Sequence, residues 1–244
     1  MTRPDARSSS GPALDLDKVR FQWPGARGFG IEIGSFTVGR GEHVLLLGES
    51  GAGKSTLLSL VCGVVAPQAG RIVVLGEDIT RMGATARDRF RAEHFGIIFQ
   101  MFNLLPYANA IDNVLLPLGF AARRRQRATE HRSAAEEAER LLAALGIEGE
   151  LAKAGAAAEL SIGQQQRVAV ARALIGAPEI VIADEPTSAL DAGTREKFLD
   201  LLFGQLGETG STLVMVSHDE RLAARFGRVV RIGDISRVTG EKAA

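Results

Sequence analysis

Glycines, a lysine and a serine stand between residues 48 and 55 in a spacing that suits phosphate chemistry. The stretch reads Gly-Glu-Ser-Gly-Ala-Gly-Lys-Ser and matches the pattern G-x-x-x-x-G-K-S. Glycine lets the backbone turn its N–H groups toward phosphate oxygens, and a following helix adds the positive end of its dipole. The lysine would place a point charge on the β- and γ-phosphates, and the serine hydroxyl would reach Mg²⁺. We therefore predict a site for a nucleoside triphosphate, made by Gly48, Ser50, Gly51, Gly53, Lys54, Ser55 and Thr56.

Two adjacent carboxylates, Asp184 and Glu185, end an apolar stretch much later in the chain. Such a pair at the end of a buried strand is costly unless it faces a cation or a reacting group. We expect Asp184 to hold Mg²⁺, as Ser55 does, and Glu185 to act as general base for the attacking water. A salt-bridged acidic pair is the structural alternative.

The elements that must position these groups alternate between strand and helix patterns, which favours an α/β fold with a mostly parallel sheet. The run 44–47 is continuously apolar, as expected of a strand covered on both faces. We predict strands at 14–19, 31–38, 44–47, 71–75, 95–99, 180–183 and 211–216, helices at 54–64, 80–93, 110–118, 121–146 and 192–207, and a closing hairpin of 229–232 and 235–238 around Gly233-Asp234.

The organisation along the chain is that of one domain. Residues 1–12 are polar and rich in Ser, Arg and Pro, and we predict a disordered tail there. We predict a single nucleotide-hydrolysing domain over residues 13–240, which opens with an antiparallel β subdomain and carries an inserted helical subdomain at about 85–175. The basic run 123–127 is interpreted as a solvated helix face, with contact to anionic lipid headgroups as an alternative.

Composition excludes several classes of function. Lys and Arg together number 29, as do Asp and Glu, so the 244 residues carry no basic excess and we expect no nucleic-acid partner. A single cysteine, Cys62, excludes an internal disulfide and suits a reducing compartment. We find no signal peptide and no apolar run long enough to span a bilayer, and therefore expect a cytoplasmic protein.

The order of the motifs resembles the ATP-binding subunits of ABC transporters, over about residues 14–238. The resemblance rests on the phosphate loop, Gln100 after an apolar strand (Q-loop), Leu160-Ser161-Ile162-Gly163-Gln164 (signature), Asp184-Glu185, Ser188-Ala189-Leu190-Asp191 (D-loop) and His218 after a further strand. It implies ATP hydrolysis with Mg²⁺, with Glu185, His218 and Gln100 as catalytic residues and Gln100 also at the metal. It further implies that two copies sandwich two ATP molecules, with Ser161, Gly163, Gln164 and Asp191 contributing to nucleotide binding.

Two positions need separate comment. Trp23 stands where the family places a ring that stacks on adenine, and capping of a hydrophobic cluster is the alternative. Ile162 replaces the glycine that is usual at the third position of the signature. Because it adds bulk beside the partner's nucleotide, we expect slower or more selective closure of the dimer.

The stretches 100–106 and 112–118 are similar to one subgroup, which serves lipoprotein release and macrolide export at bacterial envelopes. The chain also ends soon after the core, without the C-terminal regulatory domain of several importers. The resemblance implies an integral membrane permease that docks near 100–118, on Phe102, Leu104, Leu105 and Tyr107, and places the protein at the cytoplasmic face of the membrane. An importer of the amino-acid type and a regulator of cell-wall enzymes remain alternatives.

Overall fold

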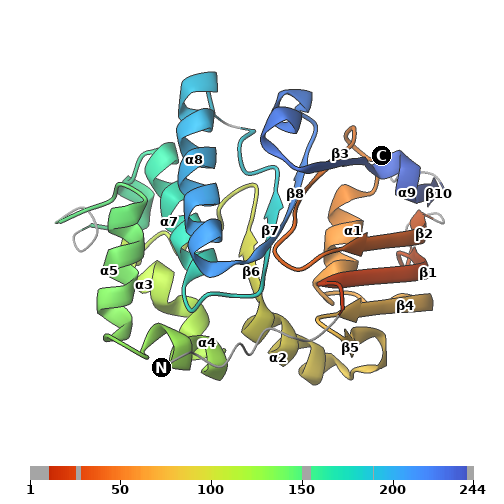
Figure 1. Ribbon diagram of the computed structural model, residues 1–244, viewed down its shortest axis with the longest axis horizontal. Helices are drawn as coiled ribbons and strands as arrows, with labels where there is room; N and C mark the ends of the chain where they lie inside the picture. Colours follow the sequence, from red (N-terminus) through yellow and green to blue (C-terminus); the bar gives the residue numbers. More distant parts are fainter. Residues whose placement is uncertain (1–10, 26–28, 150–154, 189, 241–244) are drawn as a thin grey trace.

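Two five-stranded sheets of different character organise the chain (Figure 1). The computed structural model describes residues 11–25, 29–149, 155–188 and 190–240. One sheet is parallel, in the order β6-β7-β8-β3-β9, and the other is antiparallel, in the order β10-β2-β1-β4-β5. The predicted α/β fold, with a parallel core, an antiparallel β subdomain and inserted helices, is confirmed.

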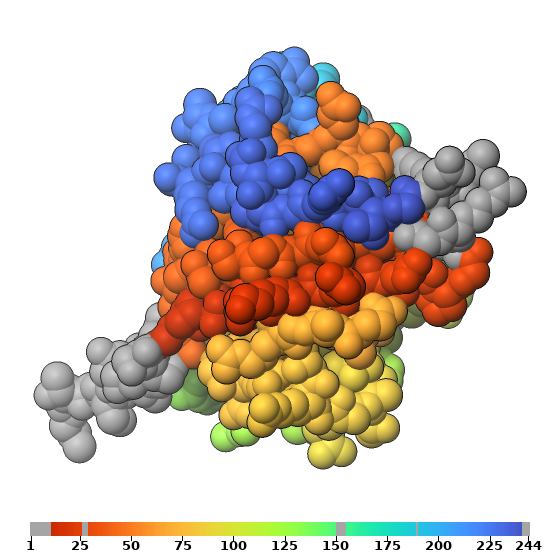
Figure 2. Space-filling model, turned by 90° about the vertical axis from the view of Figure 1, so that its right-hand side faces the viewer, coloured from red at the N-terminus to blue at the C-terminus, as the bar shows by residue number. Residues whose placement is uncertain are grey.

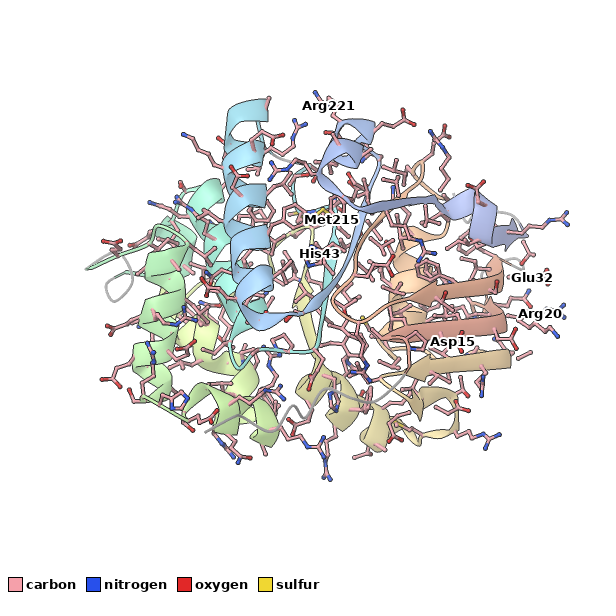
Figure 3. All side chains as sticks on the ribbon, in the orientation of Figure 1. Asp15, Arg20, Glu32, His43, Met215 and Arg221 are labelled. Atoms are coloured by element: carbon pink, nitrogen blue, oxygen red, sulfur yellow. The ribbon has the colours of Figure 1, made fainter. Side chains whose placement is uncertain are left out.

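The central strands of the parallel sheet are buried on both faces, which explains their continuously apolar sequences, whereas the edge strand at Arg228–Arg231 is partly exposed. Alternate residues of each strand face two separate clusters: Leu45 and Met215 face one, while Val44 and Val214 face the other. Met215, labelled in Figure 3, lies in the interior between these layers. The strands are β6 (Phe95–Ile98), β7 (Ile180–Asp184), β8 (Thr212–Ser217), β3 (His43–Leu47) and β9 (Arg228–Arg231).

The parallel arrangement brings the carboxyl ends of β3, β6, β7 and β8 to the same edge of the sheet. At that edge the phosphate loop follows β3, Gln100 follows β6, Asp184 ends β7, and His218 follows β8. Ligands of open α/β sheets bind beyond the carboxyl ends of the strands. The sheet topology therefore collects the predicted chemistry at one place.

Helix α1 (Lys54–Val61) lies between the two sheets, and the antiparallel sheet covers the side of α1 that faces away from the parallel sheet, as Figure 1 shows. Figure 2 looks onto the outer face of this sheet, where the last strand (blue) lies beside the first strands (red). Arg20 and Glu32 form an ion pair of 2.9 Å on this outer face, away from the parallel sheet (Figure 3). The strands are β1 (Leu14–Gln22), β2 (Gly30–Val38), β4 (Ala69–Val74), β5 (Glu77–Asp78) and β10 (Ser236–Thr239).

Helices α3, α4, α5 and α7 gather on the side of the parallel sheet that is opposite the antiparallel sheet (Figure 1). The helices are α2 (Ala84–His94), α3 (Ala110–Leu115), α4 (Ala122–Ala128), α5 (Ala134–Ala144), α7 (Ile162–Leu174), α8 (Ala192–Thr209) and α9 (Ile232–Ile235), with short 3₁₀ turns at Ile79–Arg81, Leu116–Gly119, Ala157–Glu159 and Glu220–Arg225. None of the helices in the described ranges is both long and apolar enough to cross a bilayer.

The span 85–175 holds most of these helices and also β6, which pairs with β7 in the parallel sheet. Residues 1–10 of the predicted disordered tail lie outside the described residues.

The single helix predicted at 121–146 is wrong. It is two helices, because α4 ends at Ala128 and α5 begins at Ala134. Ser133 caps α5, and its hydroxyl accepts a hydrogen bond from the N–H of Glu136, whose carboxylate accepts one from the N–H of Ser133. Ser-x-x-Glu is the sequence signature of such a capping box, and it marks a helix start inside the Ala-rich stretch.

The interpretation of 123–127 as a solvated helix face is also wrong in part. Arg123 and Arg125 are exposed, but Arg124 is only 2% exposed and Arg127 is half-buried. The Arg124 guanidinium donates to the carbonyls of Phe95, Ala173 and Ile175 at 2.9 Å or less. It therefore joins α4 to the start of β6 and to the end of α7.

The prediction of a closing hairpin is also wrong. β9 pairs in parallel with β3, whereas β10 pairs antiparallel with β2 in the other sheet. The intervening residues, Gly233-Asp234 included, form the single turn α9. Because β2 and β3 each offer an unpaired edge, pairing with these distant strands wins over a local hairpin.

Candidate active site

The phosphate loop connects the end of β3 to the first residue of α1, Lys54. Gly51 and Gly53 adopt φ values of +89° and +88°, in the left-handed region that favours glycine. A Cβ on Gly53 would also lie 2.9 Å from the Cδ1 of Ile31. The positive φ of Gly53 therefore favours glycine at this position, and a larger residue would also displace the Ile31 side chain.

A cavity of about 750 Å³ opens beside this loop and collects predicted residues from four segments of the chain. Trp23, Gly48, Ser161, Gly163, Gln164 and Asp191 are not among its lining residues. It is lined by Glu49, Ser50, Gly51, Gly53, Lys54, Ser55, Thr56, Gln100, Asp184, Glu185 and His218.

Glu185 is the centre of the charge network in this cavity. Its carboxylate lies 2.9 Å from the Nζ of Lys54 and accepts a hydrogen bond of 2.9 Å from the Nδ1 of His218. Lys54 also donates to the carbonyl of Gly48 at 2.6 Å. Burial raises the pKa of the Glu185 carboxyl, but His218 and Lys54 together outweigh burial and hold that pKa below its ordinary value. The carboxylate is therefore ionised at neutral pH and available as a proton acceptor.

Asp184 differs from its neighbour in its electrostatics. Burial, followed by the charge of Glu185, raises the pKa of Asp184, and the charge of Lys54 and a hydrogen bond with Ser55 oppose that rise. A carboxylate and a hydroxyl side by side are oxygen ligands of the kind that Mg²⁺ prefers. Ser55 and Asp184 therefore fit a metal ion, and a cation would relieve the repulsion between the two carboxylates.

Gln100 occupies the exposed turn that follows β6 and faces the same cavity. Phe102 and Asn103, two and three residues after Gln100, both have positive φ values, +58° and +49°. The position of Gln100 therefore depends on a turn that non-glycine residues rarely adopt.

Trp23 packs beside the phosphate loop. Its Nε1 donates to the Oγ1 of Thr56 at 3.2 Å, and its ring meets Phe21 edge-on at 5.0 Å between centroids. The ring is partly buried against the core cluster, which is the alternative that the sequence left open. Adenine stacking stays a prediction.

The signature residues stand at the start of α7, outside the cavity of their own chain. Ser161 caps this helix: its hydroxyl accepts from the N–H of Gln164, and the Gln164 amide oxygen accepts from the N–H of Ser161. Ile162 is 58% exposed beside them, and a Cβ on Gly163 would meet open space. Asp191 likewise caps α8 and accepts from the N–H of Thr194. Ser161 and Ile162 are thus exposed at the start of α7, and Asp191 is exposed at the start of α8.

Two buried arginines that the sequence analysis missed hold the segments carrying Gln100 and His218. Arg172 of α7 donates to the carbonyls of Phe102 and Asn103. Arg195 of α8 donates to the carboxylate of Asp219, which follows His218, at 2.6 Å. The sequence could have indicated them, because each is a charged residue on the apolar face of a helix. Burial of a charge there costs free energy unless the charge has partners.

An apolar groove of about 650 Å³ runs between α2 and the turn Leu116–Gly119. Phe99, Leu116 and Phe120 line it with 38–73% of their surfaces exposed. Of the residues predicted to form a docking groove, Phe102 is buried, Leu104 and Leu105 are half-buried, and Tyr107 is 78% exposed. Leu116 of this groove lies within the segment 100–118 where docking is predicted, and docking itself stays a prediction.

Comparison with known proteins adds independent information. The family model described as ABC transporter matches residues 31–188. The lipoprotein-releasing system ATP-binding protein LolD of Syntrophotalea carbinolica is 44% identical over 202 residues, which cover 82% of this chain and 84% of the relative. The macrolide export ATP-binding/permease protein MacB of Rhodopirellula baltica is 43% identical over 80% of this chain, but this match covers only 28% of that longer protein.

A solved structure is similar over nearly the whole fold. It is the dimer of an ATP-binding cassette in a post-hydrolysis state, bound to ADP and Pi. The TM-score is 0.74 with 32% sequence identity, and the match covers 95% of this chain and 100% of that chain.

Proposed function

The chain belongs to the ABC transporter family as an ATP-hydrolysing cassette, and on that premise we propose that it powers export or extraction of a lipid-linked or hydrophobic substrate at the bacterial envelope. The observation that carries the catalytic part is the cavity shared by Lys54, Gln100, Asp184, Glu185 and His218. The names of the relatives, lipoprotein release and macrolide export, support the choice of substrate class.

In the proposed mechanism, Glu185 is the general base. Its ionised carboxylate accepts the proton of the attacking water, and the hydrogen bond from His218 holds the carboxylate in place. The Nζ of Lys54, now 2.9 Å from Glu185, would turn to the β- and γ-phosphates and balance their charge. Bound Mg²⁺, held by Ser55, Asp184 and Gln100, would neutralise charge that develops on the phosphates.

Two copies of the chain would form the working unit. Ser161 and Ile162 are exposed at the start of α7, where a γ-phosphate held by the partner would be favourable at a helix N-terminus. Removal of that phosphate would weaken the contact, so hydrolysis would open the dimer. The dimeric state of the solved neighbour supports this arrangement.

The membrane partner would dock in the apolar groove beside Phe99, Leu116 and Phe120. Exposed aromatic and aliphatic side chains in one groove mark interaction sites. Because Phe99 directly precedes Gln100, a permease segment in this groove would sense nucleotide state through one residue. The protein would thereby lie at the cytoplasmic face of the membrane as a peripheral subunit.

A pair of variants tests the catalytic part. Glu185→Gln should abolish Mg²⁺-dependent ATP turnover while the affinity for a fluorescent ATP analogue persists. The matched control is Glu196→Gln, since Glu196 is an exposed residue of α8 that pairs with Arg225. Unchanged turnover in Glu185→Gln would refute the role of this carboxylate.

The transport part requires identification of the partner. We would tag the protein, extract native membranes in mild detergent and identify what co-purifies. An integral partner with few membrane spans and a large extracytoplasmic domain supports export or the regulation of cell-wall enzymes. A permease with many spans and an associated binding protein would instead indicate import, and recovery of no membrane protein would refute the transporter assignment.

A further inference from the structure

The turn that follows Gln100 has an unfavourable backbone conformation, which other contacts must stabilise. Phe102 and Asn103 are consecutive non-glycine residues with φ values of +58° and +49°. L-residues adopt this left-handed region reluctantly, and two in succession are rarer still. Local hydrogen bonds exist, from the N–H of Phe102 to Phe99 and from that of Asn103 to Met101. They span only three and two residues, so the turn needs support from elsewhere in the fold.

Arg172 provides that support from the last turn of α7. Its guanidinium donates from Nη1 to the carbonyl of Asn103 at 2.6 Å and from Nη2 to the carbonyl of Phe102. Arg172 is only 7% exposed, and within the described ranges no carboxylate forms an ion pair with it. The charge of this buried side chain is thus met by the two carbonyls of the left-handed turn. Hydrogen bonds from a charged donor are stronger than neutral ones.

The platform on which Arg172 stands is itself fixed to the sheet. Arg124 donates to the carbonyls of Ala173 and Ile175 at the end of α7 and to that of Phe95 in β6. The backbones of β6 and α7 approach so closely that a Cβ on Gly96 would lie 2.2 Å from the carbonyl oxygen of Ala173. Figure 1 shows α7 beside this part of the sheet. The guanidinium of Arg172 therefore acts from a rigid position.

We propose that Arg172 is a positioning residue for catalysis, which holds the Phe102–Asn103 turn in its left-handed conformation and thereby places Gln100 in the nucleotide cavity. This inference rests on the proposed function, because it concerns turnover of ATP in that cavity. Loss of Arg172 lets the turn relax, and Gln100, two residues upstream, leaves its position. Among the described residues no hydrogen bond joins the phosphate loop to this turn, so ATP binding persists while turnover falls.

A double-mutant cycle between Arg172 and Gln100 tests this inference. Arg172→Gln should lower kcat by about ten-fold or more, because a displacement of about 1 Å can cost that much. In the Gln100→Ala background the same substitution should change kcat by less than about two-fold, since its effect acts through the missing side chain. The Kd for a fluorescent ATP analogue should stay within about two-fold of wild type.

Two further variants separate positioning from general stability. Arg172→Lys keeps the charge but lacks the planar guanidinium that donates to both carbonyls. Its kcat should lie between those of wild type and Arg172→Gln. Asn103→Gly in the Arg172→Lys background should restore part of the turnover, because glycine adopts positive φ without cost from a side chain. The matched control is Arg127→Gln: Arg127 donates to the carbonyl of Gly176 at 2.7 Å and has no contact with the turn. The change in kcat caused by Arg127→Gln should be the same with and without the Gln100 side chain.

Several results would overturn the inference. One is an Arg172→Gln variant whose kcat equals that of wild type. Another is a loss of kcat that is equal with and without the Gln100 side chain, which would mean that Arg172 has a structural role only. If Arg172→Gln does not fold, the same cycle is run with Arg172→Lys and decides in the same way. A wild-type protein without Mg²⁺-dependent ATP turnover would contradict the proposed function itself, and this is seen before any Arg172 variant is made.

Discussion

Replacement of Arg124 by methionine should destabilise the protein by several kcal/mol, although this residue belongs to a run of arginines whose sequence indicates an exposed helix face. Its guanidinium donates to the carbonyls of Phe95, Ala173 and Ile175 at 2.9 Å or less, and more weakly to that of Arg172 at 3.4 Å. Burial, followed by the charge of Arg127, lowers the pKa of Arg124 to about 10, so it stays charged at neutral pH.

The magnitude follows from the groups that the substitution leaves without a donor. A buried carbonyl that loses its partner costs about 1–3 kcal/mol, so three of them give a loss of at least about 3 kcal/mol. In a chain of this size, a loss of 1 kcal/mol lowers Tm by about 2–4 °C. We therefore expect Arg124→Met to lower Tm by at least about 6–12 °C.

Thermal unfolding followed by circular dichroism or differential scanning calorimetry measures this change. The matched control is Arg125→Met, because Arg125 is the next residue of the same helix and is exposed. The control should lie within about 2 °C of wild type, since surface substitutions cost little. An Arg124→Met variant with a Tm within about 2 °C of wild type, or an equal loss in both variants, would refute the burial argument.

Three other predictions follow from single side chains. The pKa of Glu185 is held below its ordinary value of 4.5, so its ionised form stabilises the fold above that pH and ceases to do so as pH falls through the lowered pKa. The Tm difference between wild type and Glu185→Gln should therefore be present at pH 7 and shrink in acid, and a constant difference would contradict the pKa direction. Ile162→Gly should raise the ATPase rate if the exposed isoleucine slows closure of the dimer, and an unchanged rate would reject that hypothesis. Burial raises the pKa of the Cys62 thiol to about 12, so a thiol reagent at neutral pH should label the unfolded protein and spare the native one; fast labelling of native protein would count against its burial.

Much of the fold and of the site could be predicted because the signals are local. The glycines before Lys54 and the apolar strand before Asp184 each act within a few residues of chain. The order of these motifs was enough to indicate the family and a nucleotide cavity. The capping box at Ser133 was equally local and was overlooked in a stretch rich in Ala.

The remaining features depend on which distant segments meet. Arg123 and Arg124 are neighbours of the same type, yet one is exposed and the other is buried against the end of α7. Whether an arginine becomes a donor to buried carbonyls depends on the packing of another helix, which local sequence does not encode. For the same reason Arg172 was missed, since its acceptors lie about 70 residues away.

The sequence by itself determined the phosphate loop, the alternation of strands and helices and the choice of candidate site residues, because backbone conformation and hydrophobic period are properties of neighbouring residues. Only the tertiary structure decided that β9 and β10 pair in different sheets, because the free edges they join belong to strands far away in sequence. It also decided the contacts of Lys54 and His218 with Glu185, because these side chains follow three different strands that become adjacent only when the sheet has assembled.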